Sequence, residues 1–306
     1  MITLSDNHAF YAFEPGLTAA LSVAQGDEFT LATRDCFANQ LRSSTDTLEQ
    51  LDWDRINPAT GPVRIEGVQP GDLVRIQIRR LQPVGNAVMT TIPGSGALSG
   101  ITEASTTIVE NGNGTITLPT ERGPLTLPAK PMIGVIGLAP AEGKIPNGTP
   151  GVHGGNMDCT LIGEGATLYL RAAVEGGMFG CGDSHSLMGD GEVLVVGAET
   201  PALVTLVADV VDEPKLPVPF LENDDLYAVI ASAPSSDDAF KLACDLMFGF
   251  LTEVVKLSAN DTGRLMTLVG DLKFCQVVDP ALTVRFEFPR SVLAQLGFTG
   301  IAKGGK

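Results

Sequence analysis

Short apolar runs separated by glycine, proline and asparagine recur along most of this chain, and they limit the folds that it can adopt. Residues 63–65 and 73–78 alternate apolar with polar side chains, as half-buried strands do. The Pro-Gly-Asp sequence at 70–72 places a tight turn between them. Further short runs fill residues 84–128, again divided by Gly and Asn. The pattern predicts a mainly β fold of packed sandwich-like or barrel-like subdomains.

The C-terminal part of the chain departs from this pattern and predicts a small α-containing portion. One helix is expected near 236–256, and a second, shorter helix over 260–269. An apolar stripe on the first helix is interpreted as core and not as a cofactor site. The stripe consists of Phe240, Ala243, Leu246, Met247 and Phe250. The candidate N-cap residues are Ser235, Ser236 and Asp237 for the first helix, and Asn260 and Asp261 for the second.

A length of 306 residues allows one or two domains with a large core. We expect an N-terminal β subdomain over residues 1–130. A β-rich catalytic subdomain over residues 131–306 would carry the helices.

Composition excludes several classes of protein. Hydrophobic residues make up 44% of the chain and charged residues 18%, as in a globular protein. The formal net charge of −16 argues against nucleic acid and against anionic membrane surfaces as partners. The five cysteines form no CxxC pair, and neither a secretion signal nor an apolar run of about 20 residues is present. A cytoplasmic protein with reduced thiols is the expectation.

Polar side chains that can bind a metal ion or a substrate are concentrated between residues 150 and 199. This stretch holds two of the three histidines, His153 and His185, with amide and carboxylate side chains spaced by glycines. Glycine lets backbone segments approach closely and reach positive φ. The stretch therefore predicts a polar pocket. Its other polar members are Asn156, Asp158, Asp183, Asp190 and Glu192.

Imidazole and carboxylate groups together are suited to a divalent metal ion such as zinc. Asp183 and His185 are two residues apart, so on an extended segment they point the same way. A metal-activated water would need a base, and Glu142 and Glu192 are the candidates. A hydrogen-bonded network of turns explains the same spacing equally well. Asp35, at the end of an N-terminal strand, is interpreted as a turn cap or as a site residue.

A covalent mechanism is the main alternative. Cys159 and Cys181 lie within the same stretch, near the two histidines, and a thiolate nucleophile needs such a base. Both cysteines are nevertheless interpreted as core residues, because Cys159 leads into an apolar pair. No G-x-S-x-G sequence supports a serine nucleophile.

Several motifs in order along the chain carry a resemblance to a known family. They are N-P-A-T-G-P-V-R-I-E-G-V-Q-P-G-D (57–72), I-G-V-I-G-L-A-P (133–140), P-G-V-H-G-G-N-M-D (150–158), G-D-S-H (182–185), G-D-G-E (189–192) and G-D-L-K-F-C-Q-V-V-D-P (270–280). Together they resemble the acetamidase/formamidase family. The resemblance implies a mainly β fold, metal dependence, assembly into homo-oligomers, and hydrolysis of a short carboxamide to carboxylate and ammonia.

The resemblance also implies which residues form the site. The metal ligands would be His153, Asp158, Asp183, His185 and Asp35, and the catalytic residues Glu142, Glu192 and Asn156. Zinc is the expected ion. Glu142 or Glu192 would accept the proton of water, and Asn156 would orient the substrate. The alternative from another class is a non-catalytic β-sandwich module in which the ion stabilises loops or a ligand.

The chain departs from the family pattern at Arg171, Met188 and Cys181, and in the family's small residues after the second histidine. Arg171 and Met188 are expected to reshape the mouth of the pocket. A guanidinium near the site would attract an anionic group, so carboxylate-bearing amides are included among the expected substrates.

Overall fold

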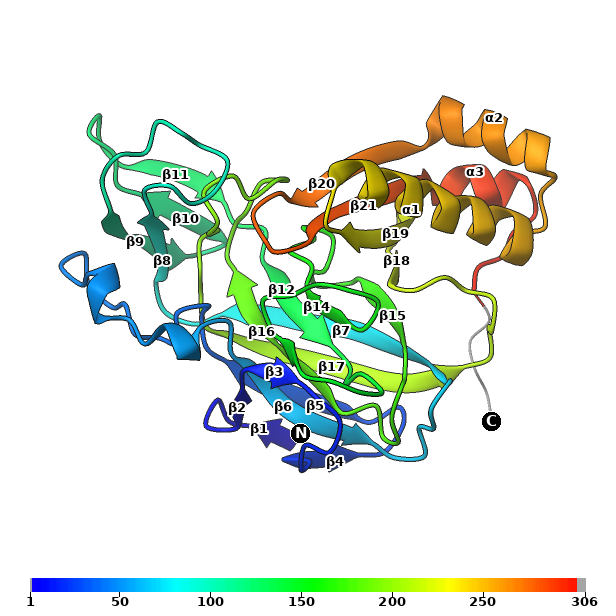
Figure 1. The fold of residues 1–306 in the computed structure, drawn as a ribbon, viewed down its shortest axis with the longest axis horizontal. Coiled ribbons are helices and arrows are strands. Elements are labelled where there is room, and N and C mark those ends of the chain that lie inside the picture. The colour runs from blue at the N-terminus through cyan, green and yellow to red at the C-terminus, as the bar shows by residue number, and fades with distance from the viewer. Residues whose placement is uncertain (1, 302–306) are drawn as a thin grey trace.

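The computed structural model describes residues 2–301. Its largest element is a nine-stranded sheet in the order β1-β5-β17-β7-β15-β18-β19-β21-β20 (Figure 1). All pairings in it are antiparallel except β1 with β5. Its strands are β1 (Ile2–Leu4), β5 (Glu28–Thr33), β7 (Leu73–Pro83), β15 (Thr167–Arg171), β17 (Ala202–Val211), β18 (Phe220–Glu222), β19 (Leu226–Ala233), β20 (Asp271–Gln276) and β21 (Leu282–Pro289).

A second sheet runs in the order β14-β12-β16-β6-β2, and β4 pairs with β6 in addition. Its strands are β2 (Ala9–Phe10), β4 (Leu21–Val23), β6 (Ala59–Ile65), β12 (Met132–Gly137), β14 (Gly154–Asn156) and β16 (Phe179–His185). Two small sheets complete the β structure. They consist of β8 (Ala87–Thr91), β9 (Ser105–Gly112), β10 (Thr115–Leu118) and β11 (Leu125–Pro128), and of β3 (Ala12–Phe13) with β13 (Ile145–Pro146).

The main core lies between the two large sheets. Leu31, Ile76 and Leu206 from the nine-stranded sheet belong to one buried cluster with Ile133 and Phe179 from the second sheet. Burial of this much apolar surface is the dominant favourable term in folding. The expected mainly β fold is confirmed.

Helices cover part of the nine-stranded sheet near the C-terminus (Figure 1). On α1, Ala243 and Met247 pack into one cluster with Val229 of β19 and Phe288 of β21. The expected apolar stripe is therefore core. The helical elements are η1 (Leu48–Gln50), η2 (Trp53–Arg55), α1 (Ser236–Gly249), the π-helical turn η3 (Phe250–Val254), α2 (Ala259–Val269) and α3 (Arg290–Gln295).

Both expected C-terminal helices are present, and their N-caps follow the same rule. The side chain of Ser235 accepts a hydrogen bond from the Asp238 backbone at the start of α1. Ser258 does the same for α2 with the backbone of Asp261. The expected cap of the second helix is corrected, because Asn260 and Asp261 lie inside its first turn.

The division at residue 130 stays a prediction. Strands from both sides of it share the two large sheets, since β7 lies between β15 and β17, and β16 lies between β6 and β12. No helix within residues 2–301 has the length and apolar character needed to cross a membrane.

Candidate active site

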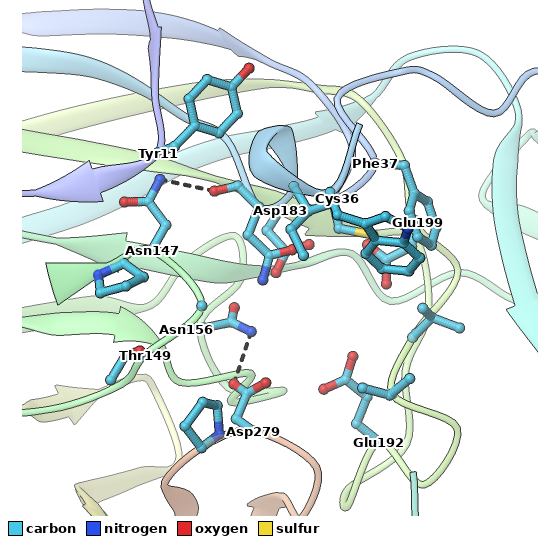
Figure 2. A pocket seen from close by; sticks show the side chains of 18 of the residues that line it. Tyr11, Cys36, Phe37, Asn147, Thr149, Asn156, Asp183, Glu192, Glu199 and Asp279 are labelled. Atoms are coloured by element: carbon cyan, nitrogen blue, oxygen red, sulfur yellow. Dashed lines mark hydrogen bonds between the residues drawn. The ribbon is translucent and has the colours of Figure 1, made fainter. Parts of the chain in front are cut away.

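A cavity of about 480 Å³ opens between the second sheet and several loops (Figure 2). Five of its lining residues are carboxylates. They are Asp54, Asp183, Glu192, Glu199 and Asp279. Polar and apolar side chains therefore meet in one concave space, as in most small-molecule sites.

Strand pairing brings two of the predicted ligands to the same place. Asp183 and His185 are at the end of β16, and β12 pairs with this strand so that Met132 faces His185. Asp158 follows β14, on the other side of β12. Gly134 of β12 makes room between them, because a Cβ there would collide with Asp158 Oδ1 and lie 2.7 Å from Asp183 Oδ2.

The backbone at these acids is unusual. Asp158, Asp183 and Glu192 have φ values of 42°, 54° and 46°. A left-handed conformation is disfavoured for residues with a Cβ, and it concentrates at functional sites where the surrounding structure holds it. Here it directs the three carboxylates toward the same buried volume.

The imidazole of His185 lies among acids. Its Nε2 is 3.2 Å from Glu199 Oε1, 3.5 Å from Asp183 Oδ1 and 3.9 Å from Asp158 Oδ1. Glu199 is oriented in turn by the backbone N–H of Gly197, which donates to Oε1 at 2.7 Å. We call Asp158, Asp183, His185, Glu192 and Glu199 the acidic centre; all five are buried.

The charges of the acidic centre do not balance. A single imidazolium faces four carboxylates, and no lysine or arginine of residues 2–301 forms an ion pair with any of them. Both carboxylate oxygens of Asp158, one oxygen each of Asp183 and Glu199, and both ring nitrogens of His185 are buried without a hydrogen bond of normal geometry to the described residues. Buried charges without partners are costly unless a cation or a proton joins them.

The donor atoms fit a divalent cation. One ligand atom each from Asp158, His185 and Glu192 lie within 4.8 Å of one another, and the same holds for Cys36, Asp183 and Glu199. Carboxylate oxygen and imidazole nitrogen, with a thiol nearby, match the preferences of zinc and similar ions.

The pKa values of Asp158, Asp183 and His185 are shifted by burial and by the neighbouring carboxylates. Burial, with Glu192 and Asp183 close by, raises the pKa of Asp158 well above its usual range. Burial and the charge of Glu199 raise the pKa of Asp183 to about 6. For His185, burial lowers the pKa, but the neighbouring Glu199 and Asp183 carboxylates outweigh it and leave the pKa well above 6.5. All three shifts express the same excess of negative charge.

An amide side chain lies at the edge of the cavity. Asn156 donates from Nδ2 to Asp279 Oδ2 at 2.9 Å, while its Oδ1 is buried without a partner among the described residues (Figure 2). Gln276 Oε1 accepts from the backbone N–H groups of Val278 and Asp279, which fixes the loop that carries Asp279. Burial raises the pKa of Asp279 to about 8.

The structure therefore gathers Asp158, Asp183, His185 and Glu192, and places Asn156 on the cavity wall. His153 lies elsewhere, and the expected convergence of both histidines on one cation is corrected. His185 pairs with one end of β12, whereas His153 precedes Gly154, which pairs with the other end. Roughly 20 Å of strand separates the two backbones.

Two further predicted residues lie outside this group. Glu142 is exposed and does not line the cavity, so it is not carried forward as a base. Asp35 lines a neighbouring cavity and caps a turn, since its Oδ1 accepts from the Asn39 backbone at 2.8 Å. Burial raises the pKa of Asp35 to about 7.

Arg171, one departure from the family pattern, lies away from the acids. Its guanidinium donates to the backbone carbonyls of Gly71, Pro214 and Leu216, so the expected attraction of an anionic substrate is corrected. Met188 lines a neighbouring, mainly apolar cavity that Glu192 and Val196 also line. Cys181 is buried in the main core together with Cys159, in agreement with the interpretation of both as core residues.

Sequence reasoning missed several cavity residues. Glu199 ends the stretch at 150–199 but was not among the predicted ligands, and it reaches His185 through an isolated bridge between their backbones. Cys36 is remote in sequence from Asp183 and Glu199, the other members of its group. Asp279 belongs to the motif at 270–280, and the resemblance of this motif to the family could have identified it as a site residue. Asn147 faces the cavity with Nδ2 bound to the carbonyls of Phe10 and Asn57.

The chain is similar to known proteins over most of its length. The model of the acetamidase/formamidase family matches residues 3–149 and 146–216. The chain belongs to this family.

Solved structures of similar proteins cover nearly the whole chain. An acetamidase from Bacillus halodurans is 37% identical with a TM-score of 0.93, over 97% of this chain and all of that one. A predicted acetamidase/formamidase from Thermoanaerobacter tengcongensis is 41% identical with a TM-score of 0.92, over 97% of this chain and 98% of that one.

A curated relative, the formamidase of Methylophilus methylotrophus, is 25% identical over 63% of this chain. The match spans 61% of the length of that relative.

Proposed function

We propose that this protein is an amidohydrolase that cleaves a carboxamide to a carboxylate and ammonia. The observation that carries the proposal is that three acids of the buried acidic centre, Asp183, Glu192 and Glu199, open into the cavity. Membership of a family with acetamidases and formamidases supports amide hydrolysis as the reaction.

Asp158, Asp183 and His185 would hold a divalent ion, and we propose zinc, because imidazole and carboxylate are among its preferred ligands. Glu199 would support the ligand set, since it lies beside His185 and is itself fixed by Gly197. When bound, such an ion polarises a carbonyl group and makes water a better nucleophile near neutral pH.

Glu192 is the proposed proton carrier. It lines the cavity beside the other acids and is 8% exposed, so it can reach both a water molecule and a substrate. Its carboxylate would take the proton from water and pass it to the amide nitrogen. This second transfer is needed because an unprotonated amide anion is a very poor leaving group.

Asn156 is the proposed orienting group. Asp279 accepts a hydrogen bond from its Nδ2, so its amide plane is fixed and its Oδ1 is left free for the substrate N–H₂ group. Positioning the amide plane in this way lowers the entropic part of the barrier.

Metal content and ammonia release, measured on the same preparation, test the proposal. We expect one tightly held divalent ion per chain, loss of ammonia release from a panel of amides after chelation, and recovery with zinc. Glu192→Gln should lose activity by at least about 100-fold and still bind the ion. Turnover that survives complete removal of metal would refute the metal site. A folded, metal-loaded protein without turnover on any amide would instead support the non-catalytic module.

Two accompanying expectations stay predictions. Assembly into a homo-oligomer is tested by light scattering in solution. A cytoplasmic location is tested by fractionation of the cells that produce the protein.

A further inference from the structure

We propose that the preferred substrate is a primary carboxamide with an uncharged apolar acyl group of about the size of phenylacetyl. This inference rests on the proposed amide hydrolysis and names its substrate class. It follows from the volume, the lining and the charge of the cavity.

The cavity is too large for a short amide. Its volume is about 480 Å³. Acetamide has four non-hydrogen atoms and would fill roughly 120 Å³ if each atom occupied as much space as a water molecule in the liquid, about 30 Å³. Most of the cavity would then stay hydrated, and an acetyl group would make few of the available contacts. Phenylacetamide, with ten such atoms, matches the volume far better.

The lining combines acids with apolar side chains. Phe37 lies beside Glu199 (Figure 2), and Val195 and Val196 belong to the loop that carries Glu192 and Glu199. Ile56, Ile92 and Trp53 are further apolar lining residues, and we call these six residues the apolar wall. An acyl group whose carbonyl lies at the acids therefore has an apolar surface beside it.

The apolar wall is well supported. Phe37 and Val196 belong to one buried cluster with Leu41, Leu51 and Val88, so the loop before β6 packs against the loop that carries the acids. Val195 has a φ of 69°, which is rare for a β-branched residue. A wall built on packed residues keeps its shape when it is empty, and this favours binding of a rigid apolar group.

The charge of the cavity selects against anionic amides. Asp54, Asp183, Glu192, Glu199 and Asp279 are among its lining residues, and no lysine or arginine of residues 2–301 is among them. A carboxylate on the acyl chain would face these acids in a partly buried space. Neutral amides are therefore preferred over succinamate-like ones.

Trp53 lies at the outer edge of the cavity. It belongs to η2, its side chain is 49% exposed, and it is the single tryptophan of the chain. The neighbouring Arg55 donates from Nε to the hydroxyl of Tyr11 at 3.3 Å, which connects this segment to another lining residue of the cavity. A bound aromatic acyl group would cover part of the indole, so fluorescence of this one residue reports binding.

The test compares kcat/KM of the metal-loaded protein for acetamide, hexanamide, phenylacetamide and succinamate. We expect phenylacetamide and hexanamide to exceed acetamide by at least tenfold, since each extra buried methylene contributes about that factor. Succinamate should fall below hexanamide, because its carboxylate faces the acids of the cavity. Phenylacetate, the product, should change the tryptophan emission as it binds.

Two variants test the wall by opposite changes of volume. Trp53→Ala removes contact area and Ile56→Trp fills the space, and each should lower the ratio of phenylacetamide to acetamide turnover by about tenfold. Phe248→Ala, an exposed aromatic on α1, is the matched control and should keep the ratio of the parent. Circular dichroism confirms that each variant folds.

The outcomes separate this inference from the proposed function. If acetamide is hydrolysed as well as or better than phenylacetamide, or if succinamate is preferred over hexanamide, the inference is wrong and amide hydrolysis stands. If no amide in the panel releases ammonia, the proposed function itself fails.

Discussion

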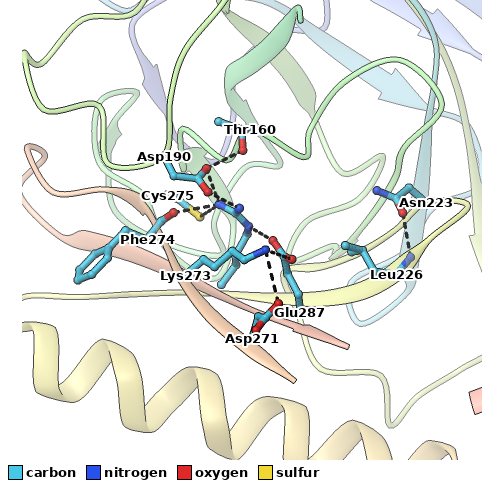
Figure 3. A network of polar contacts seen from close by, with 10 residues as sticks. Thr160, Asp190, Asn223, Leu226, Asp271, Lys273, Phe274, Cys275 and Glu287 are labelled. Atoms are coloured by element: carbon cyan, nitrogen blue, oxygen red, sulfur yellow. Dashed lines mark hydrogen bonds and ion pairs between the residues drawn. The ribbon is translucent and has the colours of Figure 1, made fainter. Parts of the chain in front are cut away.

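Two clusters of charged side chains in this protein differ in their balance of charge. One is the acidic centre, and in the other Asp190, Lys273 and Glu287 (Figure 3) gather around Arg285 of β21. Arg285 donates to both oxygens of Asp190 at 2.9 and 2.6 Å and to Glu287 Oε1 at 2.6 Å. Lys273 donates to the other oxygen of Glu287 at 2.7 Å. Positive and negative groups alternate, and each acid has a cationic partner.

The acidic centre lacks this balance. Four carboxylates surround one imidazole, and several of their oxygen atoms make no hydrogen bond to the described residues. A network that satisfies itself rigidifies a fold, whereas a group of unsatisfied acids is maintained for a ligand. Asp190 illustrates the difference, because it stands in the same glycine-rich stretch as Asp183 and yet serves the Arg285 network.

The largest effect is expected from neutralising the acidic centre. Asp183→Asn should lower kcat by about 1,000-fold or more, because it removes both a proposed ion ligand and a charge at the reacting atoms. The folded state should persist, since one of several repelling charges is gone. Ammonia release, metal content and a thermal melt measure the three quantities. Activity within tenfold of the parent would remove Asp183 from the site.

A substitution in the Arg285 network should lower stability and leave kcat unchanged. Arg285→Met leaves Asp190 and the nearly buried Glu287 without their partner, so the free energy of unfolding should fall by about 3 kcal/mol. The molecules that remain folded should keep their kcat, because no group of the cavity is lost. Urea unfolding provides the measurement. Arg264→Met, which breaks an exposed pair with Asp261, is the control and should cost less than about 1 kcal/mol. Equal losses in both variants would contradict a structural role for the buried network.

The two histidines extend the comparison. His185 lies among acids, whereas the ring of His153 packs edge-on against Phe13, with a centroid distance of 5.4 Å. Burial lowers the pKa of His153 to about 4 from 6.5. The imidazole is neutral in both states above pH 6.5, and as the pH falls the unfolded chain binds the proton first.

His153 should therefore destabilise the fold in acid, by about 2 kcal/mol at pH 5 and by more as the pH approaches 4. Urea unfolding of the parent and of His153→Phe at pH 7 and pH 5 gives the difference. The variant should lose about 2 kcal/mol less than the parent between the two pH values. The same pH dependence in both proteins would show that His153 does not titrate as its burial requires.

The smallest effect concerns a single glycine. Gly134→Ala would place a Cβ against Asp158 and Asp183, so the two carboxylates must move and activity should fall by about 10- to 100-fold. Gly263→Ala in α2 is the matched control, because a Cβ there meets no atom within 4 Å. It should stabilise the protein by about 0.5–1 kcal/mol with unchanged activity. If Gly134→Ala keeps full activity, the spacing of the two acids is not critical.

Periodic patterns of apolar residues within short segments predicted strands and helices correctly. Alternation in residues 73–78 appears as part of β7, and the stripe around Ala243 and Met247 appears as the buried face of α1. These features depend on side-chain periodicity and on caps, which neighbouring residues alone determine. The proximity of Asp183 to His185 was predictable for the same reason, although the positive φ of Asp183 was not.

In the motif at 150–158, local sequence patterns did not predict which side chains lie together. The sequence placed His153, Asn156 and Asp158 together in one predicted polar pocket. In the structure Gly154 and Gly155 are in strand β14, and they allow close contact with β12 and the Thr149 carbonyl. Because β14 runs along β12, His153 and Asp158 are placed toward different ends of that strand.

The sequence by itself determined the mainly β character, the two C-terminal helices, the glycine-rich acidic stretch and the family, because each is written in local patterns or in motifs. Only the tertiary structure decided which acids meet. Glu199 joins His185, Asp190 joins Arg285, and Asp279 joins Asn156, through pairings between segments up to 123 residues apart. No local pattern encodes these distances, because they arise from the register of strands and from the packing of one sheet on another.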